Sequence, residues 1–258
     1  MIPKPIAKVL STLSRHEVQS LLMGGQACVL YGAAEFSRDT DFVILATPSN
    51  LERLRQAMAD LQAEVIAVPP FESRYLERGH AVHFRCHHPE AAEWRVDVMA
   101  RLRGVRSFEE LWEARTTLAF ADWDGVIDLL SLPDLVQAKK TQRDKDWPML
   151  KRLVDASFFQ SEDAPTDDRV GFWLREMRTP ELLREVCRKW PEHAKAATGQ
   201  RPLLNLVLAA GSLEDLERAL ADEESRERAA DRAYWQPLRK DLEQLRHDQA
   251  KGGPESEA

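Results

Sequence analysis

The chain has 258 residues, a length that allows one large domain or two modest ones. Hydrophobic residues make up 43% and charged residues 31%, which is a globular balance and excludes a chain that is disordered throughout. The formal net charge of -7 argues against binding nucleic acid through bulk positive charge, although a local basic groove is compatible with it.

The first half of the chain alternates between short β-type runs and helical segments. In chain order we predict a strand at 19–23, a short helix at 25–33, a strand at 41–46, a helix at 50–62, strands at 64–68, 81–86 and 94–99, a helix from Ser107 and a last strand at 126–130. The polar loop at 87–93 suggests that the strands on either side of it form an antiparallel hairpin. Ser107 and Glu110 have the spacing of a capping box.

The β signal disappears after Ser131. Ser131-Leu-Pro-Asp134 is an N-cap pattern, and the helix that it starts is predicted to carry Lys139 and Lys140. Further helices are expected at 146–156, from Thr179-Pro180 through Trp190, from Gly211-Ser212 through Leu220 and along 223–248. We therefore predict an α+β fold: a mixed β-sheet flanked by helices in residues 1–130, an all-α C-terminal domain in 131–248 and a disordered tail in 249–258.

The cysteines and the hydropathy pattern bear on location. The three cysteines are scattered and odd in number, which predicts reduced thiols. The chain opens without the hydrophobic region of a signal peptide, and no apolar run approaches the roughly 18 residues of a membrane span. We expect a cytoplasmic protein with no membrane association.

Asp39 and Asp41 stand two residues apart where a buried strand begins. Acidic residues are 43 of 258, so random placement gives roughly seven such pairs and the pair alone is weak evidence. On a strand, however, side chains two apart point the same way with Cα atoms roughly 6.5–7 Å apart, a span that lets two carboxylates bind hard cations such as Mg²⁺. The alternative is a solvated turn in which Asp39 or Thr40 bonds its own backbone.

Two other features strengthen the metal hypothesis. Gly24-Gly25 lies between a strand and a helix, where glycines let backbone N–H groups approach a phosphate. Asp97 is the single acid in the middle of an apolar strand, on the same face as Arg95, and its Cβ could come within about 5 Å of the Asp-x-Asp strand. The alternative for Asp97 is an exposed ion pair with Arg95 or Arg101.

A zinc site is a weaker hypothesis. The cluster of His80, His83, Cys86, His87 and His88 resembles a ligand set only by composition. Strand alternation separates Cys86 from His83 and His87, and a single cysteine offers no closed structural zinc set. His83 could instead face the groove that holds Asp97.

Gly24-Gly25, the Asp39/Asp41 pair and a later strand aspartate, in this order, resemble the DNA polymerase β-like nucleotidyltransferase superfamily. The usual family form has Gly-Ser where this chain has Gly-Gly, and the Gly-Gly form resembles the branch of abortive-infection and minimal-nucleotidyltransferase toxins. The segment 132–146 is similar to the Leu-x-x-Leu…Lys…Arg-x-Lys-Asp helix pair that follows the sheet in that branch. The resemblance covers roughly residues 20–155.

The resemblance allows two alignments of the aspartates. The branch often reads Arg-x-Thr-x-Asp-h-Asp, and an alignment from Arg38 and Thr40 puts Val43 where an acid is expected and leaves Asp41 as the single ligand of the pair. We place the pair at Asp39 and Asp41 because only these keep the i,i+2 spacing. The compressed motif and the Gly-Gly pair keep a second hypothesis open, a catalytically inactive nucleotidyltransferase-fold protein that serves as a binding or scaffold protein.

The resemblance implies a nucleotidyltransferase-like sheet and a metal-dependent enzyme. Such an enzyme would transfer a nucleoside monophosphate from an NTP, such as ATP, to a hydroxyl of RNA, protein or a small molecule, and would release pyrophosphate. Mg²⁺ (or Mn²⁺) is the implied cofactor. A toxin of a toxin–antitoxin or phage-defence system, with an antitoxin partner, is the expected role, and an antibiotic-modifying enzyme is a further option.

The resemblance also implies a set of site residues. Asp39, Asp41 and Asp97 would hold two metal ions, and Asp97 is a candidate acceptor of the hydroxyl proton. The nucleotide would contact Gly24, Gly25, Arg38, Lys139, Arg143 and Lys145. The alternative for the basic run near residue 140 is a solvated helix face.

Overall fold

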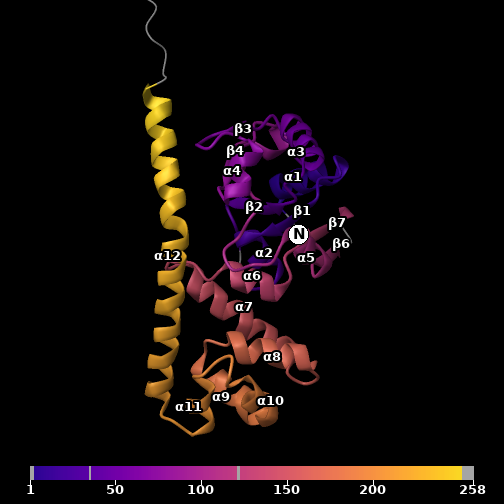
Figure 1. Ribbon diagram of the computed structural model, residues 1–258. Helices are drawn as coiled ribbons and strands as arrows, with labels where there is room; N and C mark the ends of the chain where they lie inside the picture. Colours follow the sequence, from indigo (N-terminus) through magenta and orange to yellow (C-terminus); the bar gives the residue numbers. More distant parts are fainter. Residues whose placement is uncertain (1–2, 35, 121–122, 252–258) are drawn as a thin grey trace, which may run out of the picture. The chain divides into compact units, whose positions relative to one another are not determined.

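The computed structural model describes residues 3–34, 36–120 and 123–251. Strands and helices are interspersed up to residue 129, and the described elements after it are all helices (Figure 1). In chain order the elements are α1 (Lys4–Arg15), β1 (Ser20–Met23), α2 (Gly24–Leu30), β2 (Asp39–Ile44), α3 (Pro48–Asp60), β3 (Glu64–Val65), α4 (Ser73–Arg78), β4 (Val82–Arg85), the 3-10 turn η1 (Pro89–Ala91), β5 (Arg95–Met99), α5 (Phe108–Glu113), β6 (Thr116–Phe120), β7 (Trp123–Leu129), α6 (Leu132–Ala138), α7 (Asp146–Ser161), α8 (Asp167–Glu176), α9 (Pro180–Lys189), α10 (Pro191–Ala197), α11 (Leu204–Leu208) and α12 (Leu213–Lys251).

The strands form one mixed sheet of seven in the order β3-β4-β5-β2-β1-β7-β6. β2 occupies the centre, parallel to β5 on one side and antiparallel to β1 on the other. β4 and β5 form the predicted antiparallel hairpin. A mixed sheet flanked by helices and followed by a helical C-terminal region confirms the predicted α+β class.

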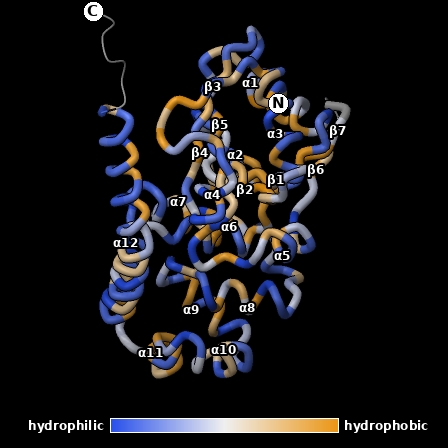
Figure 2. Tube along the Cα trace, turned by 45° about the horizontal axis from the view of Figure 1, so that its top comes forward, coloured by the Kyte–Doolittle hydropathy of each residue, from blue (hydrophilic) through white to orange (hydrophobic). Residues whose placement is uncertain are grey.

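The core of the sheet runs through its two central strands. Leu21 and Leu22 of β1 are fully buried, as are the consecutive residues 42–44 of β2. Because neighbouring strand residues point to opposite faces, a run of buried residues means that both faces of the sheet are covered. Figure 2 shows hydrophobic residues gathered along β1 and β2, whereas α12 is largely hydrophilic. Burial decreases toward the start of β2, where Asp39 and Asp41 are only half-buried.

By its contacts the chain divides into two compact units. The sheet unit comprises residues up to Ala138, apart from Tyr31–Ala33, together with the chain from Ala233 onward. The helical unit comprises Tyr31–Ala33 and Lys139–Arg232. The predicted domain boundaries at residues 130 and 248 stay predictions, because grouping by contacts does not test which segments fold independently.

Several element predictions were wrong in their limits. The helix that begins after Ser131 ends at Ala138, so Lys139 and Lys140 follow it rather than lie on it. The two helices expected after Gly211 are one continuous helix, α12, whose Pro237 does not end it. Helix α12 also continues through residues 249–251 of the predicted tail, and residues 252–258 lie outside the described part of the chain.

The capping box was confirmed, whereas several elements were not predicted. Ser107 accepts a hydrogen bond from the Glu110 N–H while the Glu110 carboxylate accepts one from the Ser107 N–H, so the capping box is confirmed. Strand β6, the 3-10 turn η1 and helices α1, α4, α8, α10 and α11 were not predicted. Within the described residues, no helix combines the length and the apolarity that a membrane crossing needs.

His80, just after α4, is a buried histidine in the sheet unit. Its side chain is 1% exposed, its ring meets that of Tyr75 edge-on and neither ring nitrogen makes a hydrogen bond. The nearest acid is Asp241 on α12, whose Oδ2 lies 3.4 Å from His80 Nε2. Burial lowers the pKa of His80 below its ordinary value, and Arg78 lowers it further, against an opposing effect of Asp241.

This environment predicts that His80 destabilises the fold in mild acid. As the pH falls below about 6.5, His80 binds a proton in the unfolded chain but not yet in the folded chain. The free energy of unfolding therefore decreases, by at most about 1.4 kcal/mol per pH unit. Chemical denaturation of wild type and His80→Gln between pH 7.5 and 5.5 measures this, and wild type should lose more stability. Parallel losses in the two proteins would show that His80 does not contribute.

Candidate metal centre

The pairing of β2 with β5 brings the predicted aspartates together. In this parallel register Asp41 lies directly opposite Asp97, and Asp39 lies opposite Arg95. One carboxylate oxygen from each of Asp39, Asp41 and Asp97 lies within 4.8 Å of the other two. Among the described residues, these three form the one group of acids, histidines or cysteines with such spacing, so the zinc hypothesis finds no matching cluster there.

The start of β2 is fixed by contacts on both of its faces. Thr40 is fully buried, and its hydroxyl accepts a hydrogen bond from the Trp94 indole N–H at 2.7 Å. On the other face, the Ser37 hydroxyl lies 3.1 Å from the Asp39 carbonyl oxygen and 3.0 Å from Asp39 Oδ1. The Thr40 contact holds the strand in place while Ser37 orients the Asp39 carboxylate. Asp39 is therefore both the first residue of the strand and a member of the acidic cluster.

The structure gives a steric reason for glycine at positions 24 and 25, which the sequence did not predict. A Cβ atom on Gly24 would stand 1.8 Å from Asp41 Oδ2, and Gly24 has φ +69°. A Cβ atom on Gly25 would stand 2.5 Å from the Ser37 hydroxyl oxygen. The pair thus makes room for Asp41 and for the serine that orients Asp39. Its contact with a nucleotide stays a prediction.

Asp97 is the most buried of the three acids, at 8% exposure. Its Oδ1 accepts from Arg95 Nε and its Oδ2 from Arg95 Nη2, both at 2.7 Å, while His83 Nδ1 lies 2.9 Å from Oδ1. Burial alone would raise the pKa of Asp97, but the hydrogen bonds and charges of His83 and Arg95 outweigh it and lower the pKa. The alternative interpretation of Asp97, a pair with Arg95, is therefore also observed, but in a buried setting.

The acidic cluster fits a divalent cation by its chemistry. Carboxylate oxygens are the preferred ligands of Mg²⁺ and Mn²⁺. At the usual Mg–O distance, two ligand oxygens of one ion are about 3 Å apart when adjacent and about 4.2 Å apart when opposite, so oxygens that lie within 4.8 Å of one another would move inward to share one ion. The strands fix the backbone of all three ligands, which suits a site that must hold its geometry.

The predicted basic residues have contacts of their own. The Arg38 guanidinium lies 5.9 Å from the centre of the Phe36 ring, an aromatic side chain that is 67% exposed. In the helical unit, Lys139 Nζ and Arg143 Nε bind the two oxygens of buried Asp146 at 3.1 and 2.7 Å. Lys145 is exposed at the start of α7. Nucleotide binding by these residues stays a prediction.

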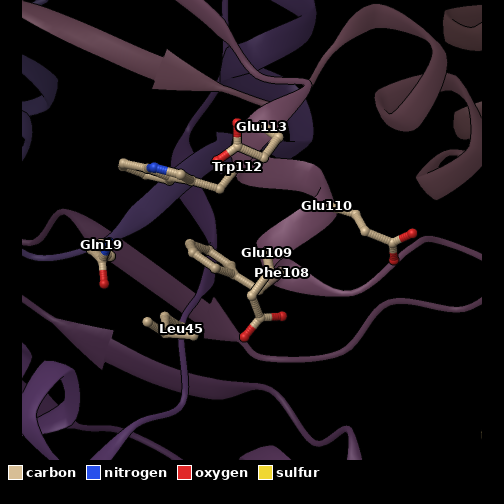
Figure 3. Close-up of a pocket in the computed structure, with 7 residues that line it drawn as sticks. All are labelled: Gln19, Leu45, Phe108, Glu109, Glu110, Trp112 and Glu113. Atoms are coloured by element: carbon tan, nitrogen blue, oxygen red, sulfur yellow. The ribbon is translucent and has the colours of Figure 1, made fainter.

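A cavity of about 320 Å³ lies elsewhere in the sheet unit. Figure 3 shows Trp112, Phe108 and Leu45 around one space, with the Glu110 carboxylate pointing away. The rest of the lining is Gln19, Glu109 and Glu113. Leu45 follows β2 whereas Asp39 begins it, so the cavity lies about 20 Å along the strand from Asp39 and is separate from the acidic cluster.

Ser37 and Arg95 contact the acidic cluster, but the sequence did not assign either of them a role there. Ser37 stands two residues before Asp39, a spacing at which serine hydroxyls commonly bond nearby backbone, and this signal could have identified it. Arg95 was considered only as an alternative partner of Asp97. Its i,i+2 spacing from Asp97 on one strand face predicts the contact.

The comparisons with known proteins are sparse. No family model matches the chain, and no curated protein matches it. A solved structure of an antigenic nucleotidyltransferase-like protein from Paracoccidioides brasiliensis is similar over 81% of this chain and 92% of that one, with 16% identity and a TM-score of 0.40. A TM-score this low carries no conclusion, so fold and site rest on the geometry of the chain itself.

Proposed function

We propose that this protein is a metal-dependent nucleotidyltransferase that moves a nucleoside monophosphate from an NTP to an acceptor hydroxyl. The observation that carries the proposal is the cluster of Asp39, Asp41 and Asp97 on two paired strands, with Asp41 directly opposite Asp97. Two acids two residues apart on one strand and a third on its neighbour supply the donors for hard cations beside a triphosphate. The sequence resemblance to the polymerase β-like superfamily supports the same function.

The residues divide the chemistry between them. The acceptor oxygen forms a bond to the α-phosphorus, the bond to the β-phosphate oxygen breaks, and pyrophosphate leaves with that electron pair. Bound Mg²⁺ would lower the pKa of the acceptor hydroxyl and offset the triphosphate charge. Asp39 and Asp41 would hold the metal, and Asp97 would hold it and accept the hydroxyl proton. In the structure, the lowered pKa of Asp97 makes it a weaker base than an ordinary aspartate.

The surrounding residues would bind the nucleotide. By the resemblance, Gly24 and Gly25 would contact a phosphate through their backbone N–H groups. Arg38 would offset phosphate charge beside the cluster. The resemblance assigns the same role to Lys139, Arg143 and Lys145, of which Lys139 and Arg143 pair with Asp146 within the helical unit. The acceptor would be a hydroxyl of RNA, protein or a small molecule. The Gly-Gly pair supports a toxin of a toxin–antitoxin or phage-defence system, with an antitoxin as partner.

Label transfer tests the function directly. Each of the four α-³²P-labelled NTPs is incubated with the protein, Mg²⁺, total RNA and soluble cell protein, and incorporated label is measured. We expect incorporation from one of them, loss of it with EDTA and recovery with excess Mg²⁺ or Mn²⁺. Asp41→Asn should reduce incorporation to background, whereas Asp60→Asn, at the end of α3 and outside the cluster, should not change it.

The outcomes separate the two hypotheses carried from the sequence. Incorporation by Asp41→Asn equal to that of wild type would overturn the assignment of the site. Nucleotide binding without incorporation under any metal condition would instead support the inactive binding or scaffold protein.

A further inference from the structure

Arg95 binds one of the three candidate metal ligands through both of its oxygens. It begins β5, two residues before Asp97 and on the same strand face, opposite Asp39. Its Nε and Nη2 donate to Oδ1 and Oδ2 of Asp97, each at 2.7 Å. This bidentate pairing of guanidinium and carboxylate is among the strongest side-chain hydrogen-bond arrangements. A cation therefore already binds the atoms that a metal would need.

The guanidinium interacts with the whole acidic cluster. The hydrogen bond to Asp97 is the main cause that raises the pKa of Arg95, and the charges of Asp97, Asp39 and Asp41 raise it as well, against an opposing effect of burial. Three carboxylates whose oxygens lie within 4.8 Å of one another repel strongly unless a cation offsets them. Arg95 supplies that positive charge within the cluster.

We propose that Arg95 is the resident counter-cation of the acidic cluster and competes with the divalent metal for Asp97, so that metal binding requires the guanidinium to leave. The inference rests on the metal-binding role proposed above. Arg95 uses one lone pair on each Asp97 oxygen and places a positive charge beside them, so a divalent cation on the same oxygens competes with it for these atoms and is repelled by its charge. The measurable consequence is that Arg95 weakens the affinity of the site for metal.

The structure allows this exchange with little rearrangement. The Arg95 side chain is 41% exposed, whereas that of Asp97 is 11% exposed. The backbone pairing of β2 and β5 fixes the positions from which Asp41 and Asp97 extend. Arg95 has a long side chain with solvent beside it, so rotation about its own bonds can release the carboxylate without movement of either strand.

His83 contacts both partners through one nitrogen. Its Nδ1 lies 3.0 Å from Arg95 Nη2 and 2.9 Å from Asp97 Oδ1. Arginine only donates and a carboxylate only accepts, so this nitrogen can accept from Arg95 or donate to Asp97, but not both at once. Which of the two bonds Nδ1 makes depends on the tautomer of the His83 ring. His83 therefore contacts Asp97 from the neighbouring strand β4, independently of the position of Arg95.

The experiment measures metal binding without substrate. Mn²⁺ alone is titrated into wild type, Arg95→Gln and Arg85→Gln, and free Mn²⁺ is followed by electron paramagnetic resonance. Arg85 is a matched control, because it lies opposite Arg95 in the β4–β5 register, is 43% exposed and binds Glu93 instead of the cluster. We expect Arg95→Gln to bind Mn²⁺ about fivefold more tightly than wild type, and Arg85→Gln to bind as wild type does.

The possible outcomes of the Mn²⁺ titrations test different claims. Equal, measurable affinities in wild type and Arg95→Gln overturn the competition and leave the metal centre standing. Equal gains in Arg95→Gln and Arg85→Gln indicate a general charge effect and also overturn it. Absence of Mn²⁺ binding in all three proteins overturns the proposed metal-dependent function itself, and the competition with it.

A second measurement guards against a folding defect. Adding Mn²⁺ should raise the melting temperature of Arg95→Gln more than that of wild type, because only in the variant does Mn²⁺ bind Asp97 without displacing a guanidinium. If Arg95→Gln does not fold, the Mn²⁺ affinity of Arg95→Lys tests the competition instead. Lysine keeps the charge but cannot make the bidentate contact. A Mn²⁺ affinity of Arg95→Lys above that of wild type supports the competition, and an equal affinity overturns it.

Discussion

Gly24→Ala is expected to abolish metal binding by displacing Asp41. The new Cβ would stand 1.8 Å from Asp41 Oδ2, 2.5 Å from its Cγ and 2.8 Å from its Cβ. Rotation of the Asp41 side chain can move the first two atoms but not its Cβ, which the strand fixes, so the backbone must shift as well. Overpacking of this kind costs roughly 1–3 kcal/mol, and alanine at φ +69° adds about 1 kcal/mol.

A second glycine separates the clash from the backbone strain. Gly32 has φ +76°, and a Cβ there would meet nothing within 4 Å. Gly32→Ala should therefore cost only about 1 kcal/mol and leave the Mn²⁺ affinity at the wild-type value. Denaturant unfolding and Mn²⁺ titration of both variants provide the comparison. Wild-type Mn²⁺ affinity in Gly24→Ala would contradict the close approach of Gly24 to Asp41.

Asp146→Ala is expected to destabilise the protein by about 3–5 kcal/mol. Asp146 is 2% exposed and accepts hydrogen bonds from Lys139 at 3.1 Å, Thr141 at 2.6 Å and Arg143 at 2.7 Å. Its removal leaves the ammonium of Lys139, a residue that is 9% exposed, without its carboxylate partner. An unpaired buried charge costs more than the pair contributes.

The neighbouring Asp144 is the matched control. Its side chain is 98% exposed and pairs with Arg228, so Asp144→Ala should change the free energy of unfolding by less than about 1 kcal/mol. Urea unfolding at pH 7 measures both variants. Replacing the partner as well, in Lys139→Met with Asp146→Ala, should recover much of the loss. Equal stabilities of Asp146→Ala and Asp144→Ala would contradict the buried pairing.

Asp146 also predicts how the free energy of unfolding depends on pH. Burial alone would raise the pKa of Asp146, but Lys139, Thr141 and Arg143 outweigh it and lower the pKa below the ordinary value of 3.8. A group whose pKa is lower in the folded chain stabilises the fold above its unfolded pKa and loses that contribution as the pH falls through the folded value. The stabilisation should thus be complete at neutral pH and disappear below about pH 4, and the difference in stability between wild type and Asp146→Ala should shrink there.

Local spacing predicted the parts of the site that depend on residues close in sequence. Strand alternation put Arg95 and Asp97 on one face, and both lie there, in contact. The i,i+2 spacing of Asp39 and Asp41 correctly placed both in one acidic cluster. The capping box at Ser107 and the β4–β5 hairpin were also predicted. Each depends on residues that are close in sequence, so a single sequence displays it.

The sequence could not determine features that depend on distant segments. Lys139 was expected on a helix with its charge available, yet it follows the end of α6 and pairs with Asp146 across a turn. The expected phosphate contact of Gly24 stays a prediction, but the sequence did not show that its missing side chain makes room for Asp41. The two expected helices after Gly211 form one, because nothing in local propensity requires a break between them.

By itself, the sequence determined which acids are candidates for the metal centre and which strand faces carry them. Only the tertiary structure decided that β5 lies parallel to β2 with Asp97 opposite Asp41, and that Arg95 is the cation at the cluster. The register between β2 and β5 joins residues more than fifty positions apart, and it is set by burial on both faces of the sheet rather than by any local pattern. The local sequence therefore identifies the candidate acids, whereas the residues that each acid meets are determined by the folded sheet.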